Sequence, residues 1–224
     1  CALPICYAEY VIARASLVVK IPDSLPFEQA AIIPDAVSTP WAAISTTARM
    51  KAGERAAVFG TGGLGIHAVQ LLKMIGCDVI AIDPRADARE KAREIGASHA
   101  FDPSDPELKS FRGLNAAFDF AGVSAVRKQA LSLLGEAGRL VIVGIANEPI
   151  TIPNDMAFTY MRTQILGHYG SEPEHTRQLV DFVASGKLDL SRSISDVLPL
   201  SSAREALTRL ENKIGNPIRI VLKP

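Results

Sequence analysis

Three glycines in the stretch VFGTGGLG have a spacing that could hold a phosphate group. Gly60, Gly62 and Gly65 follow the pattern GxGxxG, between an apolar run at residues 55–60 and a helical pattern that begins near Leu64. Such a loop uses one glycine for a tight turn, one for close approach of a pyrophosphate, and one for packing of helix against strand. The helix N-terminus adds amide donors and partial positive charge. Glycine-rich turns also occur for purely structural reasons, so the loop alone leaves that alternative open.

Asp83 makes the nucleotide interpretation more specific. It lies 18 residues after Gly65, at the end of the apolar run DVIAID. An acid at this place can accept hydrogen bonds from the hydroxyl groups of an adenosine ribose, and it repels a 2′-phosphate. The pattern therefore predicts a dinucleotide site that prefers NAD to NADP. Arg85 lies close enough to attract a 2′-phosphate, so it weakens this expected preference.

Asp35 is the second residue whose surroundings suggest chemistry. It is the one charge in AAIIPDAVSTPWAA, residues 30–43. A carboxylate among apolar residues is costly to bury without a partner. Either it caps a helix or meets solvent, or a positive group such as a divalent metal ion compensates its charge.

The elements around these residues alternate between two patterns. Short apolar runs predict buried strands at 55–60, 78–83, 115–122, 138–146 and 163–170, and amphipathic patterns predict helices at 64–75, 86–96 and 124–134. Strands that are apolar on both faces and alternate with helices predict a parallel sheet covered on both sides. The fold class expected is α/β, with a Rossmann-type doubly wound parallel sheet over residues 36–169.

The flanking segments have weaker patterns. Two short strands are expected within residues 6–22, a helix capped by Ser24 over 27–33, and another helix over 38–48. Two further helices are expected after capping boxes, Ser171 with Glu174 and Ser202 with Glu205, and a strand closes the chain. Because residue 1 is Cys and the chain opens directly on strand patterns, we expect it to be part of a longer polypeptide.

Composition excludes several classes of partner. Apolar residues make up 48% of the chain and charged residues 21%, and 24 Lys and Arg balance 24 Asp and Glu. The balance favours neither nucleic acid nor a membrane surface as partner, and no apolar run approaches the ~20 residues that span a bilayer. Three cysteines without CxxC spacing, Cys1, Cys6 and Cys77, suit a reducing compartment. A cytoplasmic location is therefore expected.

Several segments together resemble one family. YAEYV, IPDSLPFEQAA, VFGTGGLG followed by AVQLLK, IAID, REIGASHAFDP, FDFAG, GRLVIVG and IRIVL are similar, in this order, to the cofactor-binding half of the zinc-dependent medium-chain alcohol dehydrogenases. The resemblance spans about residues 7–224. It implies a remnant of a GroES-like catalytic domain at residues 1–35, an NAD-binding domain at 36–169, and helices and a strand at 170–224 that return to the catalytic domain.

The resemblance also assigns roles to individual residues. Asp35 takes the place of a catalytic zinc ligand, and Thr39 that of a residue at the nicotinamide ring; together they are the catalytic candidates. The implied cofactor-binding set comprises Thr39, Gly60, Gly62, Gly63, Leu64, Gly65, Asp83, Arg85, Ala121, Gly122, Ile145, Tyr169 and Arg219. In this set Leu64 lies behind the ring, Ile145 and Tyr169 hold the carboxamide, and Arg219 pairs with the pyrophosphate. A surface charge at Arg219 and a helix-surface hydroxyl at Thr39 are the alternatives.

The zinc site is the point at which the chain departs from the family. No Gly-His-Glu motif and no closely spaced four-Cys lobe is present, and the four histidines, His67, His99, His168 and His175, are scattered. Zinc is therefore expected only if the missing ligands are supplied from elsewhere.

The resemblance implies an NAD-dependent oxidoreductase that transfers hydride between NAD and a small alcohol or carbonyl substrate, incomplete as the chain stands. A homodimer or homotetramer is also implied. Two alternatives stay open: a non-catalytic NAD(H)-binding module, and a relative of the zinc-independent quinone reductases. The latter generally lack an acid at the place of Asp35 and prefer NADPH.

Overall fold

The computed structural model describes residues 7–224, which form two compact units. One unit comprises Thr39–Ser171, called here the sheet unit, and the other comprises the described residues up to Ser38 with Glu172–Pro224, called here the outer unit. Among the described residues, no helix is long and apolar enough to cross a membrane. Cys1 and Cys6 lie outside the described residues.

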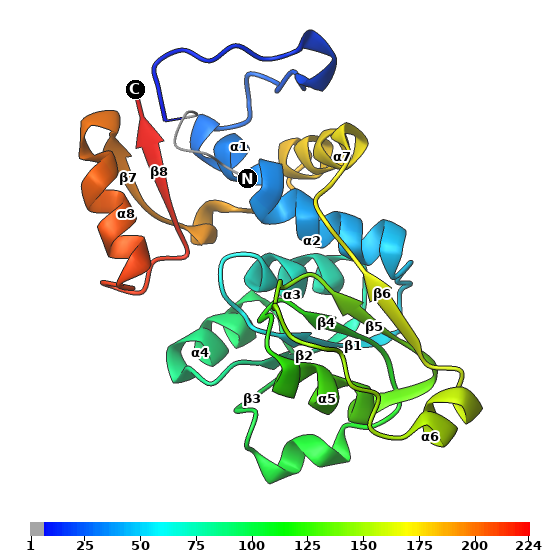
Figure 1. Cartoon of the computed structure of the whole chain (residues 1–224). Coiled ribbons are helices and arrows are strands. Elements are labelled where there is room, and N and C mark those ends of the chain that lie inside the picture. Colours follow the sequence, from blue (N-terminus) through cyan, green and yellow to red (C-terminus); the bar gives the residue numbers. More distant parts are fainter. Residues whose placement is uncertain (1–6) are drawn as a thin grey trace. The chain divides into compact units, whose positions relative to one another are not determined.

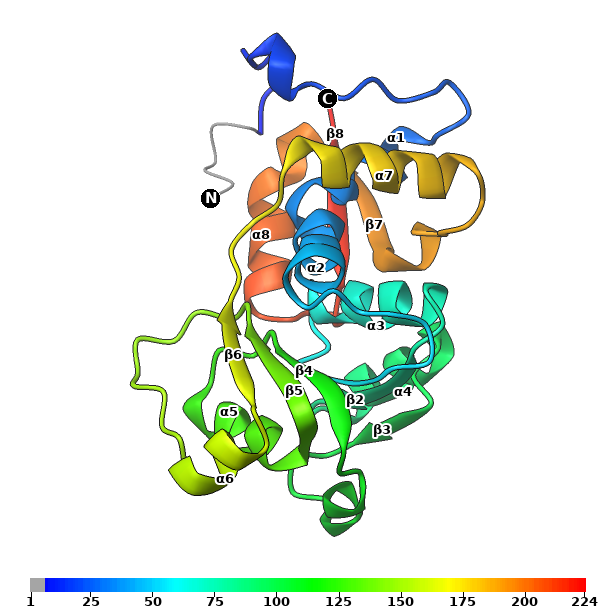
Figure 2. The same ribbon diagram turned by 90° about the vertical axis from the view of Figure 1, so that its right-hand side faces the viewer.

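The sheet unit is built on six parallel strands in the order β3-β2-β1-β4-β5-β6. They are β1 (Arg55–Phe59), β2 (Asp78–Ile82), β3 (His99–Phe101), β4 (Leu114–Asp119), β5 (Leu134–Ile142) and β6 (Gln164–Gly167). Helices α3 (Gly65–Met74) and α4 (Ala86–Ile95) cover one face, and α5 (Ser124–Leu133) covers the other (Figures 1 and 2). This confirms the predicted doubly wound α/β sheet.

The core of the sheet unit explains why these segments become strands. Phe59, Ile80, Ile82, Leu114 and Leu140 are almost completely buried and belong to one apolar cluster. In β1 and β2 every residue after the first is buried, as expected for parallel strands that have helices on both faces. The strand order reverses between β1 and β4, and in open α/β sheets ligands bind at the carboxyl ends of the strands beside such a reversal.

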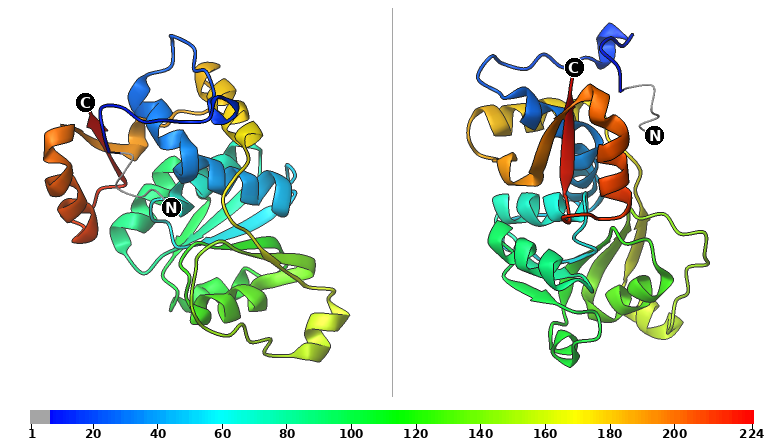
Figure 3. Two further views of the ribbon diagram at one scale, coloured as in Figure 1. Left: turned by 45° about the horizontal axis from the view of Figure 1, so that its top comes forward. Right: turned by 90° about the vertical axis from the view of Figure 1, so that its left-hand side faces the viewer.

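The outer unit combines two segments that are distant in sequence. Helix α1 (Phe27–Ile32) packs against strand β8 (Arg219–Lys223), and helix α7 (Pro173–Ala184) packs against the turn at Ile33–Val37. Strand β8 pairs in parallel with β7 (Ile194–Pro199), and α8 (Ala203–Glu211) lies beside both strands (Figure 3).

Helix α2 (Ser38–Ala42) starts at the boundary between the units and continues as a π-helical turn, Ala43–Thr47. Together these two segments confirm the helix predicted over residues 38–48. A π-helical turn changes the hydrogen-bond spacing of the helix locally and is common near functional sites.

Several predictions for the flanking segments are wrong. The described part of residues 6–22 contains no strand; it is largely exposed and has one short 3₁₀ turn, Ala15–Leu17. Strand β7 in the outer unit, and strand β3 and the short helix α6 (Asp155–Tyr160) in the sheet unit, were not predicted. Strand β3 has three residues, which is too short for a hydrophobic period to be visible.

Two of the three predicted helix caps are wrong, and the third, at Ser202, is right in position but not in its hydrogen bond. Helix α1 begins after Pro26 rather than Ser24, and α8 begins after Ser202 without a side-chain capping bond. Helix α7 does have a capping box, but it is formed by Glu172 and His175 instead of Ser171 and Glu174. The Glu172 N–H donates to His175 Nδ1 over 3.0 Å. A one-residue shift of the helix start replaced both expected partners.

Candidate functional site: the carboxyl ends of the parallel strands

The glycine loop connects β1 to α3, and its three glycines have different surroundings. Gly60 has φ +84°, and a Cβ atom there would lie 3.0 Å from the Ala121 nitrogen. A Cβ atom on Gly65 would lie 1.8 Å from the Gly60 carbonyl oxygen, so helix and strand approach too closely for any side chain. A Cβ atom on Gly62 would meet nothing within 4 Å. The structure thus requires Gly60 and Gly65, whereas Gly62 leaves open space beside the loop.

A hydrogen bond from His67 on α3 holds the glycine loop. This histidine is fully buried, and its Nδ1 lies 2.8 Å from the Gly63 carbonyl oxygen. Because a carbonyl can only accept, Nδ1 carries the proton in this contact. Leu64 is the N-cap residue of α3. Gly63 and Leu64 therefore lie where the first turn of α3 begins, as predicted.

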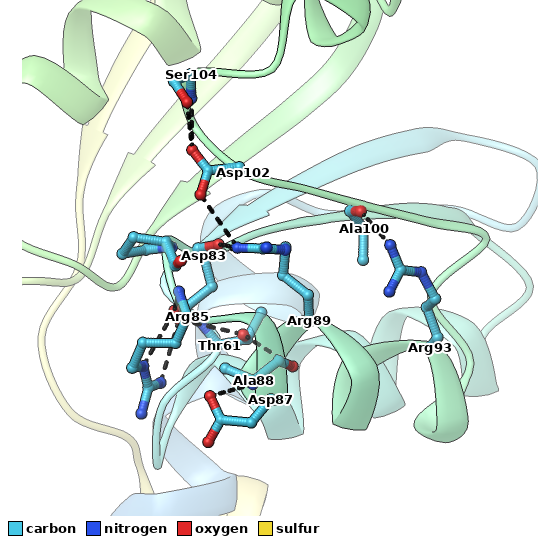
Figure 4. A network of polar contacts seen from close by, with 11 residues as sticks. Thr61, Asp83, Arg85, Asp87, Ala88, Arg89, Arg93, Ala100, Asp102 and Ser104 are labelled. Carbon is cyan, nitrogen blue, oxygen red and sulfur yellow. Dashed lines mark hydrogen bonds and ion pairs between the residues drawn. The ribbon is translucent and has the colours of Figure 1, made fainter.

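Asp83 follows directly after β2 and is only 3% exposed. Its carboxylate accepts hydrogen bonds from the Thr61 N–H at 2.9 Å and the Thr61 hydroxyl at 3.2 Å, so it is joined to the glycine loop (Figure 4). It also accepts from Arg85 Nε at 3.1 Å and the Arg85 N–H at 3.0 Å. Burial opposes ionisation, but the hydrogen bonds from Arg85 and Thr61 outweigh it and lower the pKa of Asp83.

A second arginine fixes the turn that carries Asp83. Arg89 Nη1 donates to the carbonyl oxygens of Asp83 and Pro84, both at 2.8 Å, and pairs with Asp102 at 3.2 Å (Figure 4). Neither Thr61 nor Arg89 was singled out from the sequence. The position of Thr61 inside the GxGxxG pattern was the available signal.

A buried ion pair organises the loops after β4 and β5. Asp119 is 0% exposed and Arg127 4% exposed, and Arg127 Nε lies 2.9 Å from the Asp119 carboxylate. The other Asp119 oxygen accepts from the N–H groups of Ala121 and Gly122, at 3.0 and 2.8 Å. Arg127 also donates to the Gly144 carbonyl oxygen at 3.1 Å. Ala121 and Gly122 belong to the predicted cofactor-binding set, but the ion pair that holds their backbone was not predicted.

The structure brings most of the predicted cofactor residues together at one edge of the sheet. Ala121 lies against Gly60, and a Cβ atom on Gly122 would lie 2.7 Å from the Ile145 carbonyl oxygen. Ile145 and Tyr169 follow β5 and β6, and both side chains are 83% exposed. Exposed side chains are compatible with roles that use only the backbone.

Thr39 is buried, contrary to the alternative that its hydroxyl lies on a helix surface. Its carbonyl oxygen lies 3.1 Å from Nε2 of His168, the residue after β6. Thr39 is therefore tied to the carboxyl end of β6, next to Tyr169.

Asp35 and Arg219 lie in the outer unit, so their predicted places relative to the glycine loop stay predictions. Asp35 is exposed and has φ +64°, and its N–H donates to Ser38 Oγ over 2.9 Å. Burial lowers the pKa of Arg219, and the negative charge of Asp35 opposes this shift. Asp35 thus meets solvent, as one of the two explanations predicts, and a metal ligand role for it stays a prediction.

The candidate metal ligands among residues 7–224 do not gather in one place. Within this range, no group of three or more His, Cys, Asp or Glu side chains lies close enough to hold a metal ion. Cys77 is buried, and desolvation together with the charge of Glu54 raises its pKa to about 11. The thiol of Cys77 is therefore protonated at physiological pH.

The six-stranded parallel sheet and the glycine loop at its edge are those of a Rossmann-like α/β domain. Residues 63–185 match the family model described as zinc-binding dehydrogenase, which covers more than half of the chain. The chain belongs to this family, and it corresponds to the cofactor-binding half of the zinc-type medium-chain alcohol dehydrogenases.

Individual relatives agree with this assignment. An alcohol dehydrogenase from Geobacillus stearothermophilus is 34% identical over 97% of the chain and 64% of its own length. The crystal structure of an alcohol dehydrogenase from the archaeon Aeropyrum pernix superimposes with a TM-score of 0.77 at 30% identity, over 92% of this chain and 61% of that one. The 2R,3R-butanediol dehydrogenase of Bacillus subtilis superimposes with a TM-score of 0.83 at 26% identity, over 92% and 60%. The chain therefore spans less than two thirds of the length of these relatives.

Proposed function

We propose that this chain is the NAD(H)-binding part of an oxidoreductase that transfers hydride between NAD and a small alcohol or its carbonyl product. The main support is the cradle formed by the open side of Gly62 and by Asp83, which is hydrogen-bonded to Thr61 of the same loop. A pyrophosphate can approach the backbone at Gly62, and the adenosine ribose then lies near the acid at the end of β2.

The chain's own contribution to the reaction is positional. The first half of the sheet, β1 to β3, binds the adenosine end, and the second half, β4 to β6, binds the nicotinamide end. Holding the reacting carbon of the ring against the substrate carbon and excluding water are the main tasks of the protein in hydride transfer. In this family zinc polarises the substrate oxygen. The described residues supply one candidate ligand, Asp35, so we derive no step through the metal.

The cofactor preference depends on the Asp83–Arg85 pair. Asp83 is ionised, since its pKa is lowered, and a buried carboxylate repels a 2′-phosphate. Arg85 compensates part of that charge and, with its side chain 32% exposed, can turn toward a phosphate. We infer a preference for NADH that is smaller than Asp83 alone would give.

Fluorescence titration of the chain with NADH and NADPH tests this proposal. We expect NADH to bind about tenfold more tightly, a difference of about 1.4 kcal/mol. Asp83→Ala should reduce the difference in affinity between NADH and NADPH because it removes the repelling charge. Arg85→Ala should increase this difference because it removes the compensating cation. Arg93→Ala is the matched control, since Arg93 donates to the Ala100 carbonyl oxygen and makes no contact with Asp83. Absence of binding to either nucleotide would refute the proposal, and tighter binding of NADPH would refute the preference.

A further inference from the structure

The side chain of His168 joins two elements at the carboxyl edge of the sheet. Its backbone N–H donates to the Ile142 carbonyl oxygen at 2.9 Å, which continues the pairing of β6 with β5. Its ring then reaches the helix that begins with α2. Nδ1 lies 2.9 Å from Thr47 Oγ1, and Nε2 lies 3.1 Å from the Thr39 carbonyl oxygen. All of these residues belong to the sheet unit.

The partners of the ring determine where its proton lies. A carbonyl oxygen can only accept, so Nε2 must carry the proton that it donates to Thr39. In the neutral ring Nδ1 is then an acceptor, and the Thr47 hydroxyl donates to it. Both ring nitrogens have a partner of the right kind in the neutral Nε2–H tautomer.

The location of this contact gives it a functional meaning. His168 directly precedes Tyr169 and holds the backbone of Thr39, so one ring connects two residues that are both proposed to lie at the nicotinamide end. Thr39 and Tyr169 come from segments about 130 residues apart, and β6 has only four residues to fix its end. An additional link between the segments therefore limits how far they can move relative to each other.

We propose that His168 is a positioning residue, which holds Thr39 and Tyr169 in the arrangement that receives the nicotinamide half of the cofactor. This inference rests on the proposed function, because it requires that the chain binds NAD(H). It predicts an effect at one end of the dinucleotide only. The glycine loop and Asp83 are proposed to hold the adenosine end, and their hydrogen bonds run to Thr61, Arg85 and His67 rather than to the His168 ring.

Side-chain geometry supplies a pair of variants that separate the two ring contacts. The terminal atoms of Asn reach about as far from the backbone as Nδ1 of His, whereas the amide nitrogen of Gln reaches about as far as Nε2. His168→Gln can therefore keep the donor to Thr39, and His168→Asn can keep only the acceptor for Thr47. His168→Leu removes both contacts.

The experiment compares binding of NADH with binding of ADP-ribose, which lacks the nicotinamide ring. We expect His168→Leu and His168→Asn to weaken NADH binding about tenfold, the loss typical of a part-buried hydrogen bond. They should change the affinity for ADP-ribose by less than about twofold, the scatter expected of a distant site. His168→Gln should restore most of the NADH affinity. His99→Asn is the matched control, because His99 lies in β3 and its ring packs against Phe101 and Phe111.

A merely structural role for His168 predicts a different result. Such a role would weaken the binding of NADH and of ADP-ribose to the same degree, or destabilise the fold without changing the ratio of the two affinities. Either result would overturn the proposal. Unchanged NADH affinity in His168→Asn would overturn it as well. Nitrogen chemical shifts of the imidazole give an independent readout: the Nε2–H tautomer is expected, and the Nδ1–H tautomer would contradict the contact with Thr39. Failure of the unsubstituted chain to bind ADP-ribose would instead refute the proposed function on which the inference rests.

Discussion

Replacing Arg127 with Met should strongly destabilise the sheet unit. The substitution keeps an apolar stem of similar length but leaves the Asp119 carboxylate, 0% exposed, without the cation 2.9 Å away. Removing one partner of a buried ion pair costs about 3–5 kcal/mol. Asp119 keeps its hydrogen bonds from Ala121 and Gly122, which places the expected loss at the lower end, about 3 kcal/mol.

Urea denaturation followed by tryptophan fluorescence measures this loss. The chain has one tryptophan, Trp41, which is buried in the sheet unit and so reports on that unit. Arg162→Met is the matched control: Arg162 pairs with Glu136 in the same unit, but its side chain is 71% exposed. An exposed pair contributes at most about 1 kcal/mol, so the control should unfold near the unsubstituted protein.

A double variant distinguishes the ion pair from lost packing. Asp119→Asn combined with Arg127→Met should cost less than the sum of the two single losses, because neither charge is then left buried without its partner. If Arg127→Met lies within about 1 kcal/mol of the unsubstituted protein, the Asp119–Arg127 pair does not hold these loops together and the reasoning from its burial is wrong.

Two further predictions concern the first half of the sheet. Gly65→Ala should markedly lower the midpoint of thermal unfolding, measured by circular dichroism, because its Cβ atom would lie 1.8 Å from the Gly60 carbonyl oxygen. Gly62→Val should stay folded by the same measurement but lose NADH binding in a titration, because its side chain would fill the open space beside the loop. The pKa of Asp83 is lower in the folded protein than its value of about 3.8 in the unfolded chain, so the ionised carboxylate stabilises the fold. This stabilisation is complete above the unfolded pKa and is lost as the pH falls through the lower folded pKa. Asp83→Asn should therefore destabilise the protein at pH 7, and urea titrations should show this difference shrinking below pH 4; a constant difference would contradict the linkage.

The sheet unit could be predicted from the sequence because each of its signals is local. An apolar run followed by a glycine loop and an amphipathic helix fixes a strand, a turn and a helix within about thirty residues. Gly60, Gly62, Gly65 and Asp83 fall within such a unit, and the structure places them at one edge of the sheet. The same reasoning failed where no period exists, as in the three-residue strand β3.

The residues that fix the site were missed because their partners are distant or carry no pattern. Arg127 points from the first turns of α5 back to Asp119, and eight residues with a loop between them give no helical or strand spacing. His168 and Thr39 are 129 residues apart, and only the folded sheet brings them together. Polar contacts of this kind depend on tertiary structure, so the hydrophobic periodicity of the sequence does not predict them.

Asp35 shows that the burial of a side chain cannot be inferred from its neighbours in the sequence alone. Its apolar neighbours Ile33 and Val37 are buried as the sequence suggests, but the positive φ at Asp35 turns its own backbone out of the helical path and exposes the side chain. The chain thus presents a carboxylate to solvent within the electrostatic reach of Arg219. A metal ligand would need this exposure as well as further donors, and the donors are the part that residues 7–224 do not supply together. The residues of the proposed dinucleotide site, apart from Arg219, lie within the sheet unit, so NADH binding can be tested on this chain directly.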